Sequence, residues 1–164
     1  MSMNPSIAER IAFGRPLTAE NDFAIHSEPR PTTALVGRIL LAAIFFMSGF
    51  AKLTDTAGTV AHMEAAGIPY AQTLAIFAGI AEIAGAISIA SGFLTRIGGL
   101  GLILFMIPTT LIFHGFWMFD GAEAKMQMIN FMKNLAIIGG LGLLVANGAG
   151  RFSVDQLLRR PQDP

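Results

Sequence analysis

Long runs of apolar residues, separated by short polar stretches, make up most of the sequence after residue 33. Four runs have close to the ~20 residues that an α-helix needs to cross the hydrocarbon core of a bilayer. They cover residues 34–53, 72–93, 97–116 and 128–146. Polar residues at helical period, which a helix of a water-soluble bundle needs on its outer face, are almost absent from them. The pattern predicts an all-α, membrane-spanning four-helix bundle over residues 34–147.

The composition also indicates that a bilayer is the solvent of this chain. Hydrophobic residues make up 53% of the 164 residues and charged residues only 13%, whereas a soluble domain is typically about 25% charged. Too few polar side chains remain to cover a water-soluble globule of this size. The length fits a single domain embedded in the lipid bilayer.

Two polar tails flank the predicted bundle. Residues 1–33 contain four prolines and lack the apolar core of a signal peptide. We expect a partly disordered N-terminal tail with one short interfacial helix at residues 6–13. Residues 148–164 form a C-terminal tail.

The distribution of lysine and arginine predicts the orientation of the bundle. Seven arginines lie in the two tails and in the connection between the second and third helices. The loop between the third and fourth helices has one lysine, Lys125, and the first interhelical loop, residues 55–71, has no lysine or arginine. Because positively charged segments stay on the cytoplasmic side, we predict that both termini are cytoplasmic.

The first outer loop is predicted to contain a short interfacial helix. Asp55 or Thr56 can cap its N-terminus, and Gly67 stops it before Ile68 and Pro69 turn the chain back. We expect this segment to lie flat on the membrane as a lid over the bundle.

Glu82 is the strongest single signal for a site inside the membrane. It lies near the middle of the second helix, where even a lenient insertion scale assigns an acidic residue a cost of roughly 2.5–3.5 kcal/mol. It shares a helix face with Ala75, Gly79 and Ala86, so that face points into the bundle. Glu82 is therefore either protonated or paired, as a structural tie between helices or as part of a functional site.

Two lysines are candidate partners of Glu82. Lys52 lies within a turn of the outer end of the first helix and shares a face with Ser48 and Gly49, which favours the bundle interior over a membrane-surface anchor. Lys133 lies about 7 Å below the outer surface by the rise of a helix. It shares a face with Asn130 and Asn134, and three polar groups on one stripe of an otherwise apolar helix favour a buried site over an anchor.

These residues predict one polar cavity in the outer half of the bundle. Antiparallel neighbours would bring the two lysines, Glu82 and His114 together, and His114 shares a helix face with Thr110. The predicted lining is Lys52, Glu82, His114, Asn130, Lys133 and Asn134. Two lysines against one glutamate would make the site positive, which suits a small anion or a carbonyl-bearing ligand such as a quinone head group.

Four other residues are predicted to anchor the bundle at the membrane interfaces. Arg38 and Arg96 are within reach of the cytoplasmic surface, and Tyr70 and Trp117 belong to the outer surface, where amphipathic rings collect. The glycines of the third and fourth helices predict either tight packing within one bundle or a dimer face.

Several classes of function are disfavoured. The sequence has no cysteine, which excludes disulfides, thiolate nucleophiles and cysteine-ligated iron–sulfur clusters. A bis-histidine haem would need a second histidine in the membrane, but His26 and His62 lie outside the predicted spans. No metal site is predicted. The net charge is zero without a basic stripe, so the sequence does not predict nucleic-acid binding.

The ordered set of motifs resembles one known family. The motifs are GRILLAAIFFMSGFAKLTD, AAGIP, AEIAGA, GFLTR, TLIFHGFW, MINFMKNLAIIGG and GRFSVD. In this combination, over about residues 36–155, they resemble the DoxX family of small bacterial and archaeal membrane proteins. The resemblance implies four membrane helices in the plasma (inner) membrane of a bacterium and an association with redox systems, since the namesake is a subunit of an archaeal thiosulfate:quinone oxidoreductase. It assigns no catalytic residues.

Two hypotheses for the function follow. In the first, the chain is a redox-associated membrane protein that binds a quinone or small oxyanion in the outward cavity, alone or with an oxidoreductase partner. In the second, it is a non-enzymatic scaffold or a small-solute carrier, and a carrier of this size would work as a homodimer.

Overall fold

The computed structural model describes residues 31–159, and these residues form helices and connecting turns without any strand. The elements are α3 (Pro31–Thr54), α4 (Thr56–Ala65), α5 (Ala71–Ser91), α6 (Thr95–Phe113), the short 3₁₀ helix η1 (Phe116–Met118), α7 (Gly121–Asn147) and α8 (Val154–Leu158). The interfacial helix predicted at residues 6–13 lies outside the described residues.

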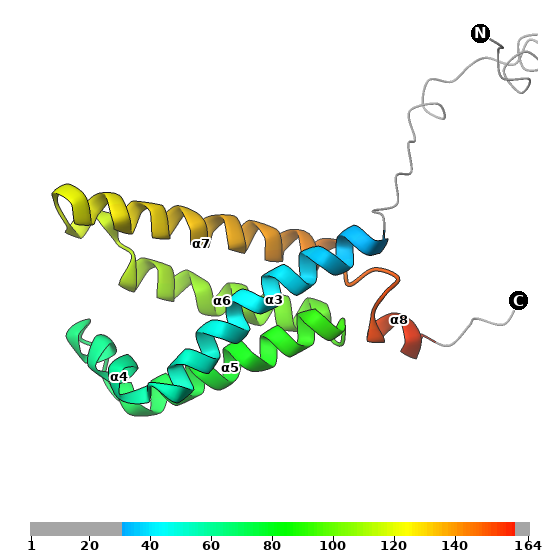
Figure 1. Ribbon diagram of the computed structural model, residues 1–164, viewed down its shortest axis with the longest axis horizontal. Helices are drawn as coiled ribbons and strands as arrows, with labels where there is room; N and C mark the ends of the chain where they lie inside the picture. The colour runs from blue at the N-terminus through cyan, green and yellow to red at the C-terminus, as the bar shows by residue number, and fades with distance from the viewer. Residues whose placement is uncertain (1–30, 160–164) are drawn as a thin grey trace, which may run out of the picture.

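Four long apolar helices form a bundle, which confirms the predicted fold class (Figure 1). α3, α5, α6 and α7 are each long enough to cross a bilayer, and their most apolar windows have mean hydropathies of 1.6 to 2.0. Pro31 begins α3 because its fixed φ suits the first turn of a helix, where a missing N–H costs nothing. Residues 31–33, predicted as part of the tail, therefore belong to the first helix.

The fourth helix begins at Gly121, well before the predicted residue 128. Residues 122–127 include alanine, glutamate, lysine, methionine and glutamine, which all favour helix. Hydropathy marks the part of a helix that suits lipid, whereas propensity decides how far the helix itself extends. The connection between α6 and α7 is correspondingly short.

The bundle has two distinct ends (Figure 1). The terminal end carries the start of α3, the turn at Gly92 and α8, and the loop end carries α4 and η1. Both ends of the described chain lie at the terminal end, as an even number of spans requires.

Close contact between α3 and α5 depends on two glycines. A Cβ added to Gly49 would lie 2.7 Å from the carbonyl oxygen of Gly79, and one added to Gly79 would lie 2.8 Å from the Leu53 side chain. Helices come this close only where neither has a side chain at the crossing. This contact sets the rotation of α3 that turns Lys52, which lies three residues after Gly49, toward α5.

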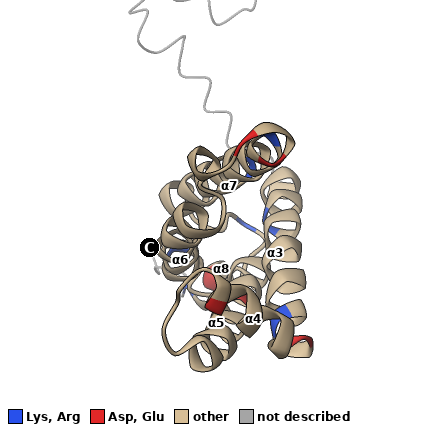
Figure 2. Cartoon of the chain, turned by 90° about the vertical axis from the view of Figure 1, so that its left-hand side faces the viewer, with Lys and Arg blue, Asp and Glu red and all other residues tan. Residues whose placement is uncertain are grey.

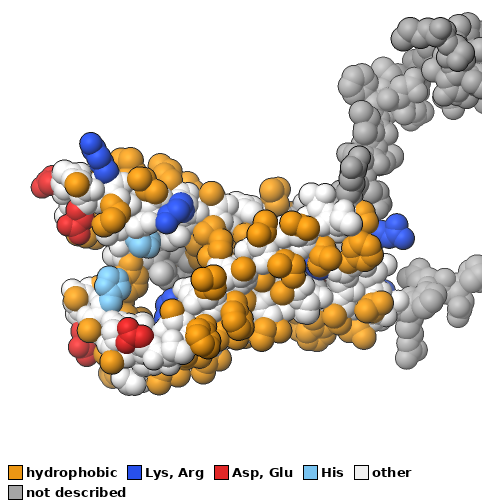
Figure 3. Space-filling view, in the orientation of Figure 1, with side chains coloured by type: hydrophobic (Ala, Val, Ile, Leu, Met, Phe, Trp, Pro, Cys, Tyr) orange, Lys and Arg blue, Asp and Glu red, His pale blue; other side chains and the backbone are white. Residues whose placement is uncertain are grey.

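The apolar core occupies the terminal half of the bundle. Its buried members are Ala42, Phe45, Ala86, Ile89, Leu102, Met106 and Leu141. On α7 only Leu141 is fully buried, and most large apolar side chains of the four helices point outward, as Figure 3 shows on one face. An apolar exterior around a small core is the pattern expected of a protein surrounded by lipid.

The helix predicted in the first outer loop is present as α4. Asp55 is its N-cap, and its carboxylate accepts a hydrogen bond from the Gly58 N–H at 3.0 Å. Gly67, with φ of +73°, follows the end of the helix and lets the chain turn back.

Arg38 is not the membrane-surface anchor that its depth predicted. Its side chain is 2% exposed, and its guanidinium donates hydrogen bonds to the carbonyl oxygens of Ala149, at 2.9 Å, and Phe152. The segment after α7 folds back beneath the bundle and covers Arg38, so the side chain ties this segment to α3. A side chain at Gly92 would collide with Arg38 and Ser153.

Candidate functional site

The loop half of the bundle contains a cavity of about 290 Å³, here called the loop-end cavity. Seen from the loop end, α3, α5, α6 and α7 surround its axis (Figure 2). Figure 3 shows this end hollowed, with histidine side chains on both sides of the mouth and a basic side chain at its base. The polar lining consists of Ser48, Lys52, Thr59, His62, Glu82, Thr109, His114 and Asn134.

An ion pair between Lys52 and Glu82 lies at the base of this cavity. The Lys52 ammonium is 2.9 Å from Glu82 Oε2 and 3.2 Å from Oε1, and it donates a further hydrogen bond to Ser48 Oγ at 2.7 Å. The Glu82 side chain is 5% exposed and the Lys52 side chain 24%. Of the two lysines considered as counter-ions, Lys52 is the partner, because the Gly49–Gly79 contact brings its helix face against α5.

Two further hydrogen bonds join α6 to α7 around the cavity. Asn134 donates to Thr110 Oγ1 at 3.0 Å. His114, the C-cap of α6, has Nδ1 2.9 Å from Gln127 Oε1. These bonds hold Gln127 and Asn134 of α7 against the C-terminal part of α6 and leave Asn134 and His114 in the lining.

Lys133 and Asn130 do not line the cavity, although the sequence predicted both there. Lys133 is exposed, and Asn130 is half-buried outside the lining. Successive helical residues are about 100° apart, so turning Asn134 inward turns Lys133 away. Asn130 is one turn nearer the loop end, beyond the part of α7 that borders the cavity. The cavity thus holds one lysine and one glutamate, and the predicted positive excess is absent.

α4 contributes three lining residues that the sequence prediction missed. Thr59, His62 and Met63 lie at positions i, i+3 and i+4 of this helix, which places them on one face. The His62 ring stacks on Phe113 at the end of α6, with ring centroids 4.9 Å apart. The periodicity of the short helix was the signal that could have identified them.

Apolar residues close the cavity toward the terminal end. Phe45 and Met106 line it and also belong to the buried core, and Ile137 of α7 joins them. These side chains separate the cavity from the apolar core behind it.

A second, more apolar space adjoins the loop-end cavity and is here called the lateral groove. It has a volume of about 590 Å³ and lies between α5 and α6 under the turn after α4. Its own lining includes Leu74, Phe77 and Ile112. The wall between the two spaces is shared, since Met63, Ala78, Phe105, Thr109 and Phe113 line both.

The remaining predicted anchors are exposed at the two ends. Tyr70 and Trp117 are 85% and 57% exposed at the loop end, and the Trp117 ring packs edge-on against Phe116 and Phe131. Arg96 is exposed at the terminal end and donates to the carbonyl oxygen of Ala146 at 3.2 Å. Their role as anchors remains a prediction.

Comparison with known proteins decides the family. The DoxX family model matches residues 33–115, about half of the chain. The chain belongs to the DoxX family. The matched part of this DoxX protein runs from α3 to the end of α6, so it includes the Lys52–Glu82 pair and His114 but not Asn134 of α7.

Curated relatives extend this likeness over most of the bundle. The chain is 37% identical to inner membrane protein YphA of Escherichia coli (strain K12) over 127 residues, which are 77% of this chain and 91% of YphA. It is 39% identical to inner membrane protein YqjF of the same strain, over 77% of this chain and 92% of YqjF. A shorter match, 37% over 82 residues, covers 49% of the chain and 26% of the ER-derived vesicles protein ERV29 of Saccharomyces cerevisiae. No solved structure matches the chain.

Proposed function

We propose that this DoxX protein is redox-associated and binds a quinone head group in the loop-end cavity. The Lys52–Glu82 pair carries the proposal. An ammonium has three donors, and Lys52 directs them at Ser48 Oγ and at both carboxylate oxygens of Glu82. A quinone carbonyl can accept the donor that makes the longest of these contacts, 3.2 Å to Glu82 Oε1, while the shorter bonds to Glu82 Oε2 and Ser48 hold the lysine in place.

The charge balance of the cavity favours a neutral ligand over a small anion. Lys52 is already neutralised by Glu82 at 2.9 Å, and Lys133 is exposed outside the lining. A second anion beside Glu82 would meet a like charge in a poorly solvated space. A neutral carbonyl compound brings no second negative charge beside Glu82, and donors for its oxygens line the cavity at Lys52, at Asn134 and at the histidines of the mouth.

The lateral groove suits the apolar tail of the same ligand. It shares five lining residues with the loop-end cavity and is bordered by Leu74, Phe77 and Ile112 on the outer parts of α5 and α6. A ligand with a polar ring and a hydrocarbon chain fits this pairing of a polar cavity with an apolar groove. Phe45 and Met106, which line the cavity and belong to the buried core, close it toward the terminal end, and this closure favours a binding site over a continuous transport path.

In this proposal an oxidoreductase partner transfers the electrons to or from the quinone, and the DoxX chain provides the site that binds the quinone. Lys52, Ser48 and Glu82 orient the head group and exclude bulk water from it. We assign no covalent or electron-transfer step to the chain's own side chains.

Ligand binding tests the proposal directly. Isothermal titration of the purified protein with a short-chain ubiquinone analogue should give saturable binding. Lys52→Met should weaken it by about tenfold, the loss expected for a charge-assisted hydrogen bond worth roughly 1.4 kcal/mol. Lys133→Ala is the matched control, since it removes a lysine outside the cavity, and its affinity should equal that of the wild type. Equal affinities for all three proteins would refute the site.

We further propose that the protein resides in the bacterial inner membrane with both termini in the cytoplasm. The relatives YphA and YqjF are named inner membrane proteins, and the arginines of the described chain, Arg38, Arg96, Arg151 and Arg159, all lie at the terminal end. The loop-end cavity would then open toward the periplasm.

Reporter fusions measure this orientation. A fluorescent protein fused after the C-terminal residue should fold and fluoresce in the cytoplasm, and alkaline phosphatase fused there should be inactive. Alkaline phosphatase inserted after Met118, at the loop end, should be active. The opposite pattern of activities would mean that the cavity faces the cytoplasm.

A further inference from the structure

A separate pocket, distinct from the loop-end cavity and the lateral groove, lies at the terminal end of the bundle. Its volume is about 530 Å³, and it lies between the start of α6, the stretch 147–150 and α8. The residues that define its character are Arg96, Arg159, Leu94, Ile97, Gly148 and Asp155. The proposed quinone site makes no use of it.

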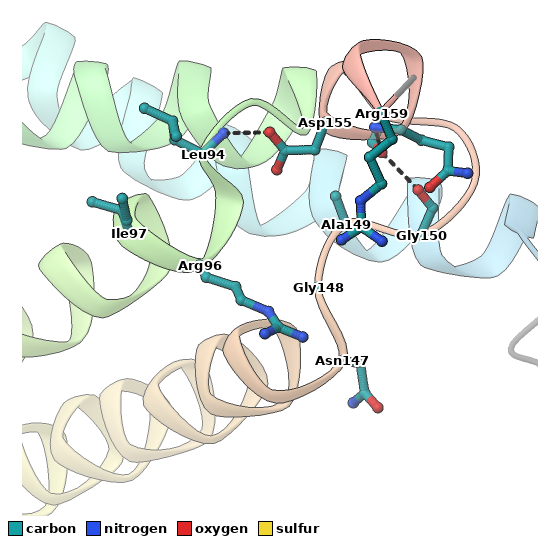
Figure 4. A pocket seen from close by; sticks show the side chains of 11 residues that line it. Leu94, Arg96, Ile97, Asn147, Gly148, Ala149, Gly150, Asp155 and Arg159 are labelled. Carbon is teal, nitrogen blue, oxygen red and sulfur yellow. Dashed lines mark hydrogen bonds between the residues drawn. The ribbon is translucent and has the colours of Figure 1, made fainter. Parts of the chain in front are cut away.

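Two arginines from different elements face this pocket (Figure 4). The guanidinium groups of Arg96, on α6, and Arg159, after α8, approach the stretch around Gly148 from opposite sides. Arg96 donates one hydrogen bond, to Ala146 O at 3.2 Å, and Arg159 makes none within the described part of the chain. Within residues 31–159, most of their N–H donors therefore make no hydrogen bond.

The carboxylate in the lining, Asp155, is hydrogen-bonded to the backbone and not to the arginines. Asp155 accepts hydrogen bonds from the backbone N–H groups of Leu94, at 2.9 Å, and Thr95, at 3.3 Å. There it stabilises the start of α6, where the helix dipole favours negative charge. Among residues 31–159 the ion pair within contact distance is Lys52–Glu82, so neither arginine of the pocket is neutralised by contact with Asp155.

The backbone beside Arg96 has no side chain at Gly148. Gly148 has a φ of +78°, a conformation that favours glycine over residues with side chains. A Cβ at this position would lie 3.6 Å from Arg96 Nε, so the glycine leaves this side of the guanidinium uncovered. A planar guanidinium matches the oxygens of a phosphate group better than any other cationic side chain does.

We propose that this pocket binds the phosphate group of an anionic phospholipid. Leu94 and Ile97 line the pocket and are 49% and 67% exposed, so an acyl chain can follow the outer face of α6 while the phosphate meets Arg96 and Arg159. Basic pockets between membrane helices on the cytoplasmic side bind anionic head groups in this way. The predicted orientation places the pocket at the leaflet where such binding occurs.

Native mass spectrometry of the full chain in detergent tests the proposal. We expect the protein to retain phosphatidylglycerol and not phosphatidylcholine. Arg96→Gln and Arg159→Gln should each weaken retention by about fivefold. Arg151→Gln is the matched control, because Arg151 is exposed at the same end but does not line this pocket, and it should change retention less than twofold.

Three outcomes would overturn the proposal. Equal weakening by Arg151→Gln would show a general attraction to the positive end of the bundle. Unchanged retention in the Arg96 and Arg159 variants would remove the site. Titration with inorganic phosphate distinguishes the source of the phosphate group: tight binding of the free ion, with the same arginine dependence and without retained lipid, would assign the pocket to a soluble phosphate.

Discussion

Lys52→Met should lower the free energy of unfolding of this protein more than Glu82→Gln does. Removing one partner of a buried ion pair costs about 3–5 kcal/mol because the other charge stays buried and unpaired. Glu82 is 5% exposed and Lys52 24%. A solitary glutamate therefore has little access to water, whereas a solitary lysine keeps both water and its bond to Ser48.

We expect a loss of about 3 kcal/mol for Lys52→Met and about 1 kcal/mol for Glu82→Gln. The double variant should lie within about 1 kcal/mol of the wild type, since it removes both charges and leaves neither unpaired. Unfolding in detergent, followed by circular dichroism, measures all three values. If the double variant were the least stable of the three, the pair would not be coupled as the geometry indicates.

Gly49→Val should have the other large effect, because it forces α3 away from α5. The new Cβ would lie 2.7 Å from the carbonyl oxygen of Gly79 and 2.9 Å from Ile83 Cγ1. A backbone carbonyl cannot move aside without moving its helix, so the loss should reach the upper part of the range for overpacked cores, about 3 kcal/mol. Quinone affinity should fall with it, since the same contact positions Lys52 against Glu82.

Gly37→Val is the matched control for this change. Gly37 is on the same helix, and a Cβ there would have no atom within 4 Å. Both variants carry the same helix propensity, so any difference between their melting temperatures reports the contact alone. Equal melting temperatures would mean that α3 and α5 can adjust freely at this crossing.

The sequence was sufficient to predict the four-helix bundle, because the bilayer strongly constrains which segments can cross it and the apolar runs meet those constraints. Spans of about 20 apolar residues have few alternatives to a membrane helix. The burial of Glu82 followed from its depth and from the small residues on its face. The cap of α4 was predictable because Asp55 immediately precedes a short helical pattern that Gly67 ends.

The sequence could not determine which face of the fourth helix turns inward. Asn130, Lys133 and Asn134 form one polar stripe, and apolar residues surround it, so the rotation of the helix about its own axis decides whether Lys133 or Asn134 enters the cavity. The structure settles the rotation through the bond from Asn134 to Thr110 at 3.0 Å. Such a bond between two helices depends on how the helices are placed relative to each other, and hydropathy alone does not predict this placement.

Arg38 illustrates a second limit. Its depth in the first helix is equally compatible with a side chain that reaches the membrane surface and with one that is covered. What covers it is the segment 149–153, more than 100 residues later in the chain. The sequence around Arg38 contains no pattern that predicts this contact.

The most direct test of the quinone site uses the absence of cysteine from the natural chain. Thr109 lines both the loop-end cavity and the lateral groove, and its hydroxyl donates only to Phe105 O of its own helix, so Thr109→Cys places one reporter at their junction. A membrane-impermeant thiol reagent added outside intact cells should label this cysteine. A saturating quinone analogue should slow the labelling severalfold. The control is Ala57→Cys on α4, which should react at the same rate with and without the quinone. Labelling of Thr109→Cys at a rate that the quinone leaves unchanged would contradict the site.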